Sequence, residues 1–426
     1  MTRHPSARAR LTLVSLHDLN LPASFASDFV TELIGAFERE GAQQAGHSVR
    51  VALLSHYLGL EMQLPPETLK ELFFSAILHD IGGIATDSHI SRKLTEIPDI
   101  FGQKTDFQIF SHPARGYAIL NRFPTLRKIA EVVYTHHEFY DGSGFPQGLK
   151  EDDIPLLSRI IRIADTTDII LRLHDIRETS ELNGFLNIIS GEEFDPAIYE
   201  RFLSMLETRA LLPVLVDDRA VLQQFREVRA QMKDQYYFAA SDSLNRFFET
   251  VAALIDNVTT LDKQHSQRVA EFAEQVALAL TLDQNQILQV RWAALLHDLG
   301  KVVGNRKIYT KSEKLSDIEW RAIRNHPEKS YEILNAVSGM QEIAFYVLHH
   351  HENYDGSGYP EGLAGDKIPL AARILRVADA FEAMTSERIY HRKRDWQMAL
   401  RELHENSGKQ FDPKIVDITV QAYQIK

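Results

Sequence analysis

The sequence predicts an all-α protein built from two tandem helical domains. Apolar residues recur at helical spacing along most of the 426-residue chain, while the alternation typical of β-strands is scarce. The two halves of the chain also repeat the same short motifs in the same order. We therefore expect a first domain over residues 1–215, a helical linker over residues 216–239 and a second domain over residues 240–426.

Helical stripes are clearest in the second half of the chain. Residues 244–258 and 269–280 carry apolar side chains three and four positions apart, which is the spacing of one helix face. The apolar segment 286–299 is expected to be a helix that ends at Gly300, because glycine readily adopts the left-handed conformation that follows a helix. Residues 217–238 are charged and helix-prone, which favours a linking helix between the halves.

The composition describes an ordinary globular protein and limits its partners. Apolar residues make up 44% of the chain and charged residues 25%. No apolar run is long enough to cross a bilayer, so we expect no membrane association. The net charge of −12 argues against general nucleic-acid binding, which needs a basic surface. The absence of cysteine excludes thiolate ligands and fits a cytoplasmic protein, so any metal must be held by nitrogen and oxygen.

The repeated motifs are rich in His and Asp. Residues 297–301 read HDLGK and residues 349–363 read HHHENYDGSGYPEGL. In the first half, residues 79–83 read HDIGG and residues 136–149 read HHEFYDGSGFPQGL. HSxRV, HP and FDP motifs also occur in both halves at a near-constant separation, which indicates a tandem duplication.

A His-Asp pair followed by a His-His-Glu run is a pattern of metal ligands. Neutral imidazole together with carboxylate suits Fe, Mn, Ni or Zn. His297 and Asp298 can reach adjacent metals from one helix turn, with the carboxylate bridging. Asp379 lies among apolar residues of a predicted helix, where an isolated buried carboxylate would be costly, so a metal partner is the economical explanation. Any single histidine here could be an ordinary core or surface residue, but the ordered set favours a metal site.

The second half resembles the HD-GYP phosphodiesterases, a branch of the HD metal-dependent phosphohydrolase superfamily. The resemblance runs from about Leu244 to Val420 and includes HDLGK, NHP, HHENYDGSGYPEGL, IPLAARILRVAD and SGKQFDP. It implies a hydrolase that opens a cyclic dinucleotide second messenger to the linear dinucleotide, and often cleaves it further to the mononucleotide. Cyclic di-GMP is the chief substrate of that family, and some members prefer cyclic GMP-AMP.

The resemblance assigns roles residue by residue. The implied ligands of two divalent ions, with Fe or Mn favoured over Ni or Zn, are His265, His297, Asp298, His326, His350, His351 and Asp379. Lys301 and Arg388 are implied phosphate contacts, and Tyr359 borders the substrate pocket. Asp298 and Lys301 are the expected catalytic residues, since phosphodiester hydrolysis depends on positioned charge. A carboxylate that holds a third ion in some members is replaced by Leu261, so two ions are expected.

The first half keeps a candidate for every ligand but has lost the cations. Its candidates are His47, His79, Asp80, His112, His136, His137 and Asp165. Gly83 stands where the second half has Lys301, His174 stands at the arginine position, and GYP has become GFP. We therefore expect a non-catalytic first domain with a regulatory or structural role. Whether it binds metal is left open by the sequence.

Three functions compete for the whole chain. The first is an enzyme whose second half hydrolyses a cyclic dinucleotide. The second is a non-catalytic cyclic dinucleotide receptor or signalling scaffold, and the third is an HD-type nucleotidase acting on linear nucleotides. The intact Lys301 and Arg388 favour the enzyme, and the GYP loop argues against the nucleotidase. A homodimer or a signalling protein partner is left open.

Overall fold

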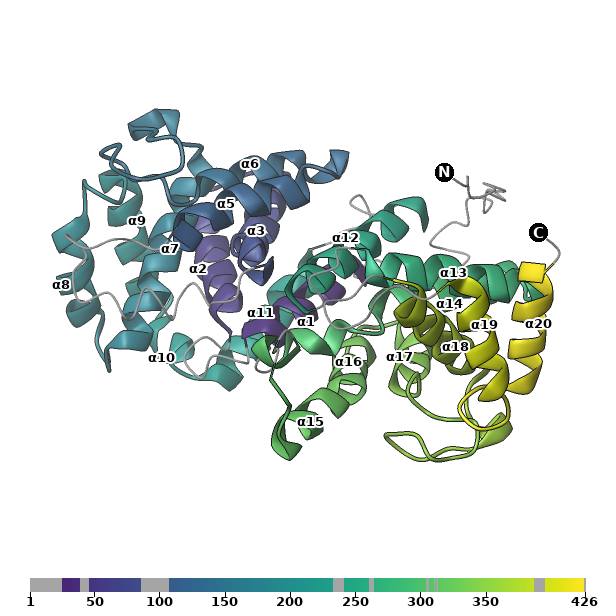
Figure 1. The fold of residues 1–426 in the computed structure, drawn as a ribbon. Helices are drawn as coiled ribbons and strands as arrows, with labels where there is room; N and C mark the ends of the chain where they lie inside the picture. The colour runs from purple at the N-terminus through teal and green to yellow at the C-terminus, as the bar shows by residue number, and fades with distance from the viewer. Residues whose placement is uncertain are drawn as a thin grey trace. The chain divides into compact units, whose positions relative to one another are not determined.

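The computed structural model describes residues 25–38, 46–85, 107–232, 241–259, 264–303, 306–309, 311, 313–386 and 395–424. Helices form nearly all of the regular structure in these residues, as Figure 1 shows. Within the same residues only isolated bridges occur, such as Ser190 with Phe194, and no named strand. The all-α prediction is confirmed. No helix in the described part of the chain is long and apolar enough to cross a membrane.

The chain divides into two compact units. We call the unit built mainly from Ala26–Tyr237 the first unit, and the unit built mainly from Phe238–Lys301 and Lys314–Lys426 the second unit. The helices up to the boundary are α1 (Phe25–Glu38), α2 (His47–Glu61), α3 (Pro66–Leu78), α5 (Phe107–Leu120), α6 (Arg127–Thr135), α7 (Leu156–Leu173), α8 (Thr179–Ile189), α9 (Pro196–Thr208), α10 (Leu212–Leu215) and α11 (Asp218–Gln231).

The helices after the boundary follow the same order. They are α12 (Ser241–Thr259), α13 (His265–Ala279), α14 (Gln284–Leu296), α15 (Asp317–Arg324), α16 (His326–Asn335), α17 (Gln341–Leu348), α18 (Leu370–Thr385), α19 (Trp396–Glu405) and α20 (Pro413–Gln424). Short 3₁₀ turns η1 (Ile81–Ala85) and η4 (Leu299–Val302) follow α3 and α14. The remaining 3₁₀ turns are η2 (Pro124–Leu126), η3 (Glu151–Asp153), η5 (Arg306–Tyr309) and η6 (Gly365–Lys367).

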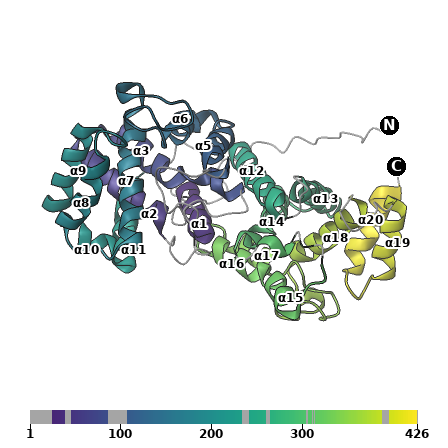
Figure 2. The ribbon, with the colours of Figure 1, turned by 60° about the vertical axis from the view of Figure 1, so that its left-hand side comes forward.

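Each unit has one helix that packs against two others, and a further pair of helices that pack against each other. In the first unit α2 packs against α3 and α7, and α5 packs against α6. In the second unit α13 packs against α14 and α18, and α16 packs against α17. Figure 2 shows α18, α19 and α20 side by side at the C-terminal end of the second unit. The same helix pairs therefore build both units, as a duplication requires.

The predicted apolar stripes lie in the cores of the units. Leu244, Phe248 and Ile255 of α12 are buried, and so are Ile374 and Val377 of α18. Helix α18 therefore packs its apolar face in the core, as expected, while the Asp379 side chain that it carries is 18% exposed rather than buried.

Helix α11 falls within the predicted linker, but it belongs to the core of the first unit. Its Val221, Phe225 and Val228 are buried. Phe225 stacks on Phe73 of α3, with the ring centroids 5.4 Å apart. A domain cut at residue 215 would lose this packing, because an amphipathic helix stabilises the fold only through its buried face.

The predicted end of the helix before Gly300 was wrong. Helix α14 ends at Leu296, and Gly300 lies in η4, where its N–H donates to Ser330 Oγ at 2.7 Å. A Cβ atom at Gly300 would lie 2.2 Å from the His326 carbonyl oxygen. The glycine is needed for this close approach of η4 to α16, which brings the His297–Asp298 turn beside His326.

We predict that Gly300→Ala destabilises the second unit. The added methyl group would collide with the α16 backbone, and overpacking of this kind costs about 1–3 kcal/mol. Differential scanning calorimetry of the full chain would measure the loss. The control is Gly184→Ala, since Gly184 is exposed inside α8 with no atom near its added Cβ. That change should stabilise the chain by about 0.5–1 kcal/mol. Equal transitions for Gly300→Ala and the wild type would contradict the prediction.

Candidate metal centre

The predicted ligands of the second unit converge from the ends of its helices. His265 begins α13, His297 follows α14 directly, and His326 begins α16. His350 and His351 come just after α17, and Asp379 projects from the middle of α18. Ligand atoms within 4.8 Å of one another form three overlapping groups: His265, His297 and Asp379; His326, His350 and His351; and His297, Asp298 and His350.

Asp298 lies between the two outer groups. Its Oδ2 is 3.4 Å from Nε2 of His297 and 3.7 Å from Nε2 of His265. Its Oδ1 is 3.3 Å from Nε2 of His326. His265 Nε2 is also 3.6 Å from Asp379 Oδ1, and His326 Nε2 is 3.3 Å from His350 Nε2. One carboxylate thus faces both groups, which is the arrangement that a bridging ligand needs.

Hydrogen bonds behind the rings orient the histidines. Three histidines donate from Nδ1–H to a backbone carbonyl three residues earlier. These bonds are His297 to Ala294 at 2.8 Å, His326 to Ile323 at 2.7 Å and His350 to Val347 at 2.6 Å. His265 Nδ1 lies 2.6 Å from Glu382 Oε2. With the proton held on Nδ1, the lone pair of Nε2 faces the centre of the site, as in metal-binding histidines.

Glu382 was missed by the sequence analysis. It is buried, and Arg268 and Ser386 hydrogen-bond to it in addition to His265. Its signal in the sequence is the spacing of three residues from Asp379, which places both carboxylates on one face of α18.

The charges suit a divalent ion. Burial alone would raise the pKa of Asp298, but His297 and Lys301 hold it well below its usual value, so the carboxylate is ionised. Burial lowers the pKa of His326 to about 4 and, with neighbouring histidines, that of His350 and His351 well below the usual value. These imidazoles are neutral, which is the state that binds a metal. Neutral nitrogens and ionised oxygens therefore fit a metal of the Fe, Mn or Zn class.

The pKa of His265 is shifted in the opposite direction to the pKa values of the three neutral histidines. Burial opposes its protonation, but the hydrogen bond from its ring to Glu382 and the nearby Asp379 raise its pKa. A metal bound there would have to displace a proton from Nε2.

Two of the three predicted substrate contacts, Lys301 and Tyr359, lie among the described residues. Lys301 Nζ donates to Asp298 Oδ2 at 2.5 Å, so the lysine lies at the metal cluster. The Tyr359 ring lies 5.0 Å from the His351 ring, and burial raises the pKa of its hydroxyl to about 12, which keeps it a donor. Arg388 lies outside the described residues, as does Leu261.

Two further arginines near the site were not anticipated. Arg324 is exposed and its guanidinium lies 5.7 Å from the centre of the Tyr359 ring. Arg376, which is three residues before Asp379, donates through Nε and Nη2 to Asn353 Oδ1 at 3.2 and 3.1 Å. Arg324 reaches Tyr359 through a contact distant in sequence. Arg376 shares a face of α18 with Asp379, and this spacing of three residues could have marked it.

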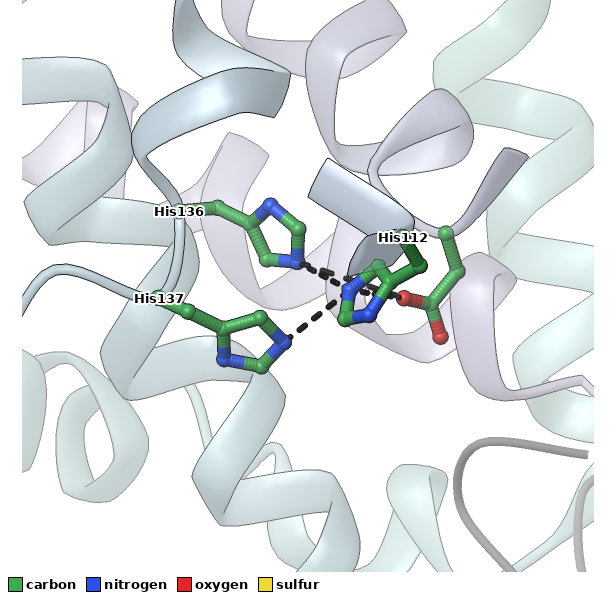
Figure 3. Close-up of side chains that lie close together, drawn as sticks. His112, His136 and His137 are labelled. Atoms are coloured by element: carbon green, nitrogen blue, oxygen red, sulfur yellow. Dashed lines mark hydrogen bonds and ion pairs between the residues drawn. The ribbon is translucent and has the colours of Figure 1, made fainter. Parts of the chain in front are cut away.

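The first unit brings its candidate ligands together in the same way. His47 Nε2 lies 3.2 Å from His79 Nε2 and 3.4 Å from Asp165 Oδ1, and Asp80 Oδ1 lies 3.2 Å from His112 Nε2. Figure 3 shows the rings of His112, His136 and His137 pointing toward one another. Their closest Nε2 atoms are 3.1–3.2 Å apart.

The missing lysine changes the surroundings of the first cluster. The Asp80 side chain is 24% exposed, whereas that of Asp298 is 3% exposed beneath Lys301. Gly83 has no side chain with which to cover the carboxylate. His174, at the arginine position, is exposed and stacks on Phe185.

Comparison with known proteins agrees with this geometry. Residues 36–177 and 249–415 match the family model described as HD domain. The chain is 27% identical to the 3'3'-cGAMP-specific phosphodiesterase 3 of Vibrio cholerae over 91% of its length and 92% of that protein. It is 34% identical to the cyclic di-GMP phosphodiesterase response regulator RpfG of Xanthomonas campestris, over 50% of this chain and 57% of that one.

A solved structure has the same fold. The crystal structure of a cyclic GMP-AMP-specific phosphodiesterase of V. cholerae superposes with a TM-score of 0.63 and 23% identity, covering 94% of this chain and 98% of that one. Both clusters of His and Asp lie inside the matched segments. The chain therefore belongs to the HD domain family, which it matches once in each half.

Proposed function

We propose that the second unit is a metal-dependent phosphodiesterase that hydrolyses a cyclic dinucleotide to the linear dinucleotide. The observation that carries the proposal is the Asp298 carboxylate, which faces one ligand group through each oxygen and has Lys301 at 2.5 Å. Relatives aligned with nearly the whole chain are phosphodiesterases by name, which supports the reaction class.

Cyclic GMP-AMP is the favoured substrate. Two relatives that align with 91% of the chain, at 27% and 26% identity, are 3'3'-cGAMP-specific phosphodiesterases of V. cholerae. The cyclic di-GMP phosphodiesterase RpfG aligns with 50% of the chain. This contrast favours cyclic GMP-AMP over cyclic di-GMP, which the family resemblance had placed first. A cytoplasmic location follows from a second-messenger substrate and is part of the proposal.

Two ions would share the cluster. His265, His297, Asp298 and Asp379 would hold one ion, and Asp298, His326, His350 and His351 the other. When bound, such ions supply a nucleophile at neutral pH and clamp the attacking and leaving oxygens of the phosphodiester. Fe or Mn is the favoured occupant by the family resemblance, and imidazole nitrogen with carboxylate oxygen suits either ion.

The side chains of the chain itself bind and orient the phosphate. Lys301 is close enough to Asp298 to neutralise a phosphate oxygen that approaches the cluster, and a pre-placed cation of this kind stabilises charge that develops in the transition state. Tyr359 can donate its hydroxyl hydrogen at the rim. Arg388 is proposed as a second phosphate contact. The first unit offers none of these groups at the matching positions, so we propose that it is catalytically silent.

Side-by-side turnover of cyclic GMP-AMP and cyclic di-GMP by the Mn-loaded full chain tests the substrate assignment. We expect faster hydrolysis of cyclic GMP-AMP, with the linear dinucleotide as the first product by chromatography. Faster turnover of cyclic di-GMP would reverse the preference. Binding of both compounds without any cleavage would favour the receptor function instead.

A second prediction concerns the bridging carboxylate. The double change His297→Ala with Asp298→Ala should abolish turnover and remove metal from the second unit, because it deletes one ligand of the first group and the carboxylate that serves both. Elemental analysis and product formation measure the two effects. Because the first unit is unchanged in this variant, wild-type turnover would show that catalysis resides elsewhere.

A third prediction separates phosphate binding from metal binding. Lys301→Ala should keep the metal content but lower kcat/KM by about a hundredfold, as expected for the loss of one pre-organised charge stabiliser. Lys367→Ala is the matched control, because Lys367 is an exposed lysine of η6. Equal kcat/KM values for both variants would show that Lys301 does not act in hydrolysis.

A further inference from the structure

In the first unit, one histidine of the ligand cluster has an arginine behind its ring. In the first unit, His79 and His136 donate from Nδ1 to the carbonyls of Ala76 and Val133, each at 2.7 Å. These rings therefore present the lone pair of Nε2 to the cluster, as their equivalents do in the second unit. His137 is different, because its Nδ1 lies 2.6 Å from Nη1 of Arg162.

The arginine determines which nitrogen of His137 carries the proton. A guanidinium group has only donors and stays protonated in proteins, so His137 Nδ1 must accept the hydrogen bond. The proton of the neutral ring is then on Nε2, which is the atom that faces the cluster, 3.1 Å from His112 Nε2. A protonated Nε2 has no lone pair for a metal. A proton on Nδ1 would instead point at the N–H of Arg162, so that two donors would face each other without an acceptor.

The side chains around this arginine differ between the two units, and Arg162 also contacts Thr166 Oγ1 and, at 3.4 Å, Glu193 Oε2. The equivalent residue in the second unit, Arg376, is held by the side-chain oxygen of Asn353. Phe139 stands at the position of Asn353 and offers no acceptor. The guanidinium of Arg162 lies 5.4 Å from the Phe139 ring centre and donates to His137 and, at 3.2 Å, to Asp165 Oδ2.

The other half of the first cluster keeps its ligand geometry. His47 Nδ1 lies 2.6 Å from Asp168 Oδ2, and His47 Nε2 is 3.2 Å from His79 Nε2. Arg172 Nη2 also lies 2.9 Å from His47 Nδ1. The carboxylate is nearer, can only accept, and binds Arg172 Nε itself at 2.8 Å, so the ring proton stays on Nδ1. Asp165 Oδ1 remains directed at His47 Nε2, at 3.4 Å.

We propose that the first unit binds a single divalent ion, through His47, His79, Asp80 and Asp165, and that Arg162 excludes a second ion from His112, His136 and His137. This site is separate from the proposed active site. The ion would join the start of α2, the end of α3 and the middle of α7, which are the helices of the first unit's central contacts. Its role is structural, and the first unit cannot assemble the metal pair that hydrolysis needs.

The test uses the full chain with the second cluster disabled. In a variant with His297, His350 and His351 changed to Ala and Asp298→Ala, Mn²⁺ is added, excess ion is removed and bound Mn is measured. We expect about one Mn per chain and the electron paramagnetic resonance spectrum of an isolated ion rather than of a coupled pair. Adding His79→Ala with Asp80→Ala should reduce bound Mn to near zero. About two Mn per chain with a coupled spectrum, or none, would overturn the proposal.

The role of Arg162 is tested in the same background. Phe139→Asn supplies the acceptor that holds the arginine in the second unit, and Arg162→Met removes the donor. Either change should raise bound Mn to about two per chain, since the tautomer of His137 is released. Arg159→Met is the control: Arg159 lies on the same helix and pairs with Asp195 at 2.7 Å, so bound Mn should stay unchanged. A folded Arg162→Met variant that still binds one Mn would show that Arg162 does not exclude the second ion. If Arg162→Met fails to fold, the Phe139→Asn result decides.

Discussion

The ligand clusters depend on the carbonyls at the ends of helices. The last carbonyls of an α-helix have no partner inside the helix. In this protein several are used by histidines three residues later: Ala76 by His79, Val133 by His136, Ala294 by His297, Ile323 by His326 and Val347 by His350. Each bond satisfies a carbonyl and fixes a ring, so that helix ends meeting at one point produce a cluster of Nε2 atoms. The helix packing therefore determines the ligand geometry.

This arrangement also explains why the glycine after each His-Asp pair matters. Gly82 and Gly300 let the turn after the pair touch the backbone of the next ligand helix, where a Cβ atom would lie 2.0–2.2 Å from a carbonyl oxygen. The contact brings the carboxylate of Asp80 or Asp298 between the two histidine groups. Burial would make an unpaired carboxylate costly at this point. Surrounding donors lower the pKa of Asp298 and Asp80 and keep both ionised.

The two units keep this framework and differ in the groups around it. Lys301 covers Asp298, while Gly83 leaves Asp80 partly exposed. Asn353 accepts hydrogen bonds from Arg376, while Phe139 offers no acceptor and Arg162 donates to His137 Nδ1. A duplicated site can thus retain every ligand residue and still lose the proton arrangement that binding of a metal pair requires. The identity of the ligands is a weaker criterion for a metal pair than the acceptors behind them.

The sequence by itself determined the all-α fold, the duplication and the candidate ligands, because helical periodicity and short motifs are local properties of the chain. It also showed that the first copy has Gly83 and His174 at the positions of Lys301 and Arg388. Other features depended on residues far apart in sequence: Glu382 behind His265, α11 in the first core and the hydrogen bond from Arg162 to His137. The role of Gly300 also depends on a distant residue, because the glycine allows close packing against the His326 backbone and does not cap a helix. The direction of a ring proton depends on the partner that faces it, and only the tertiary structure decides which partner that is.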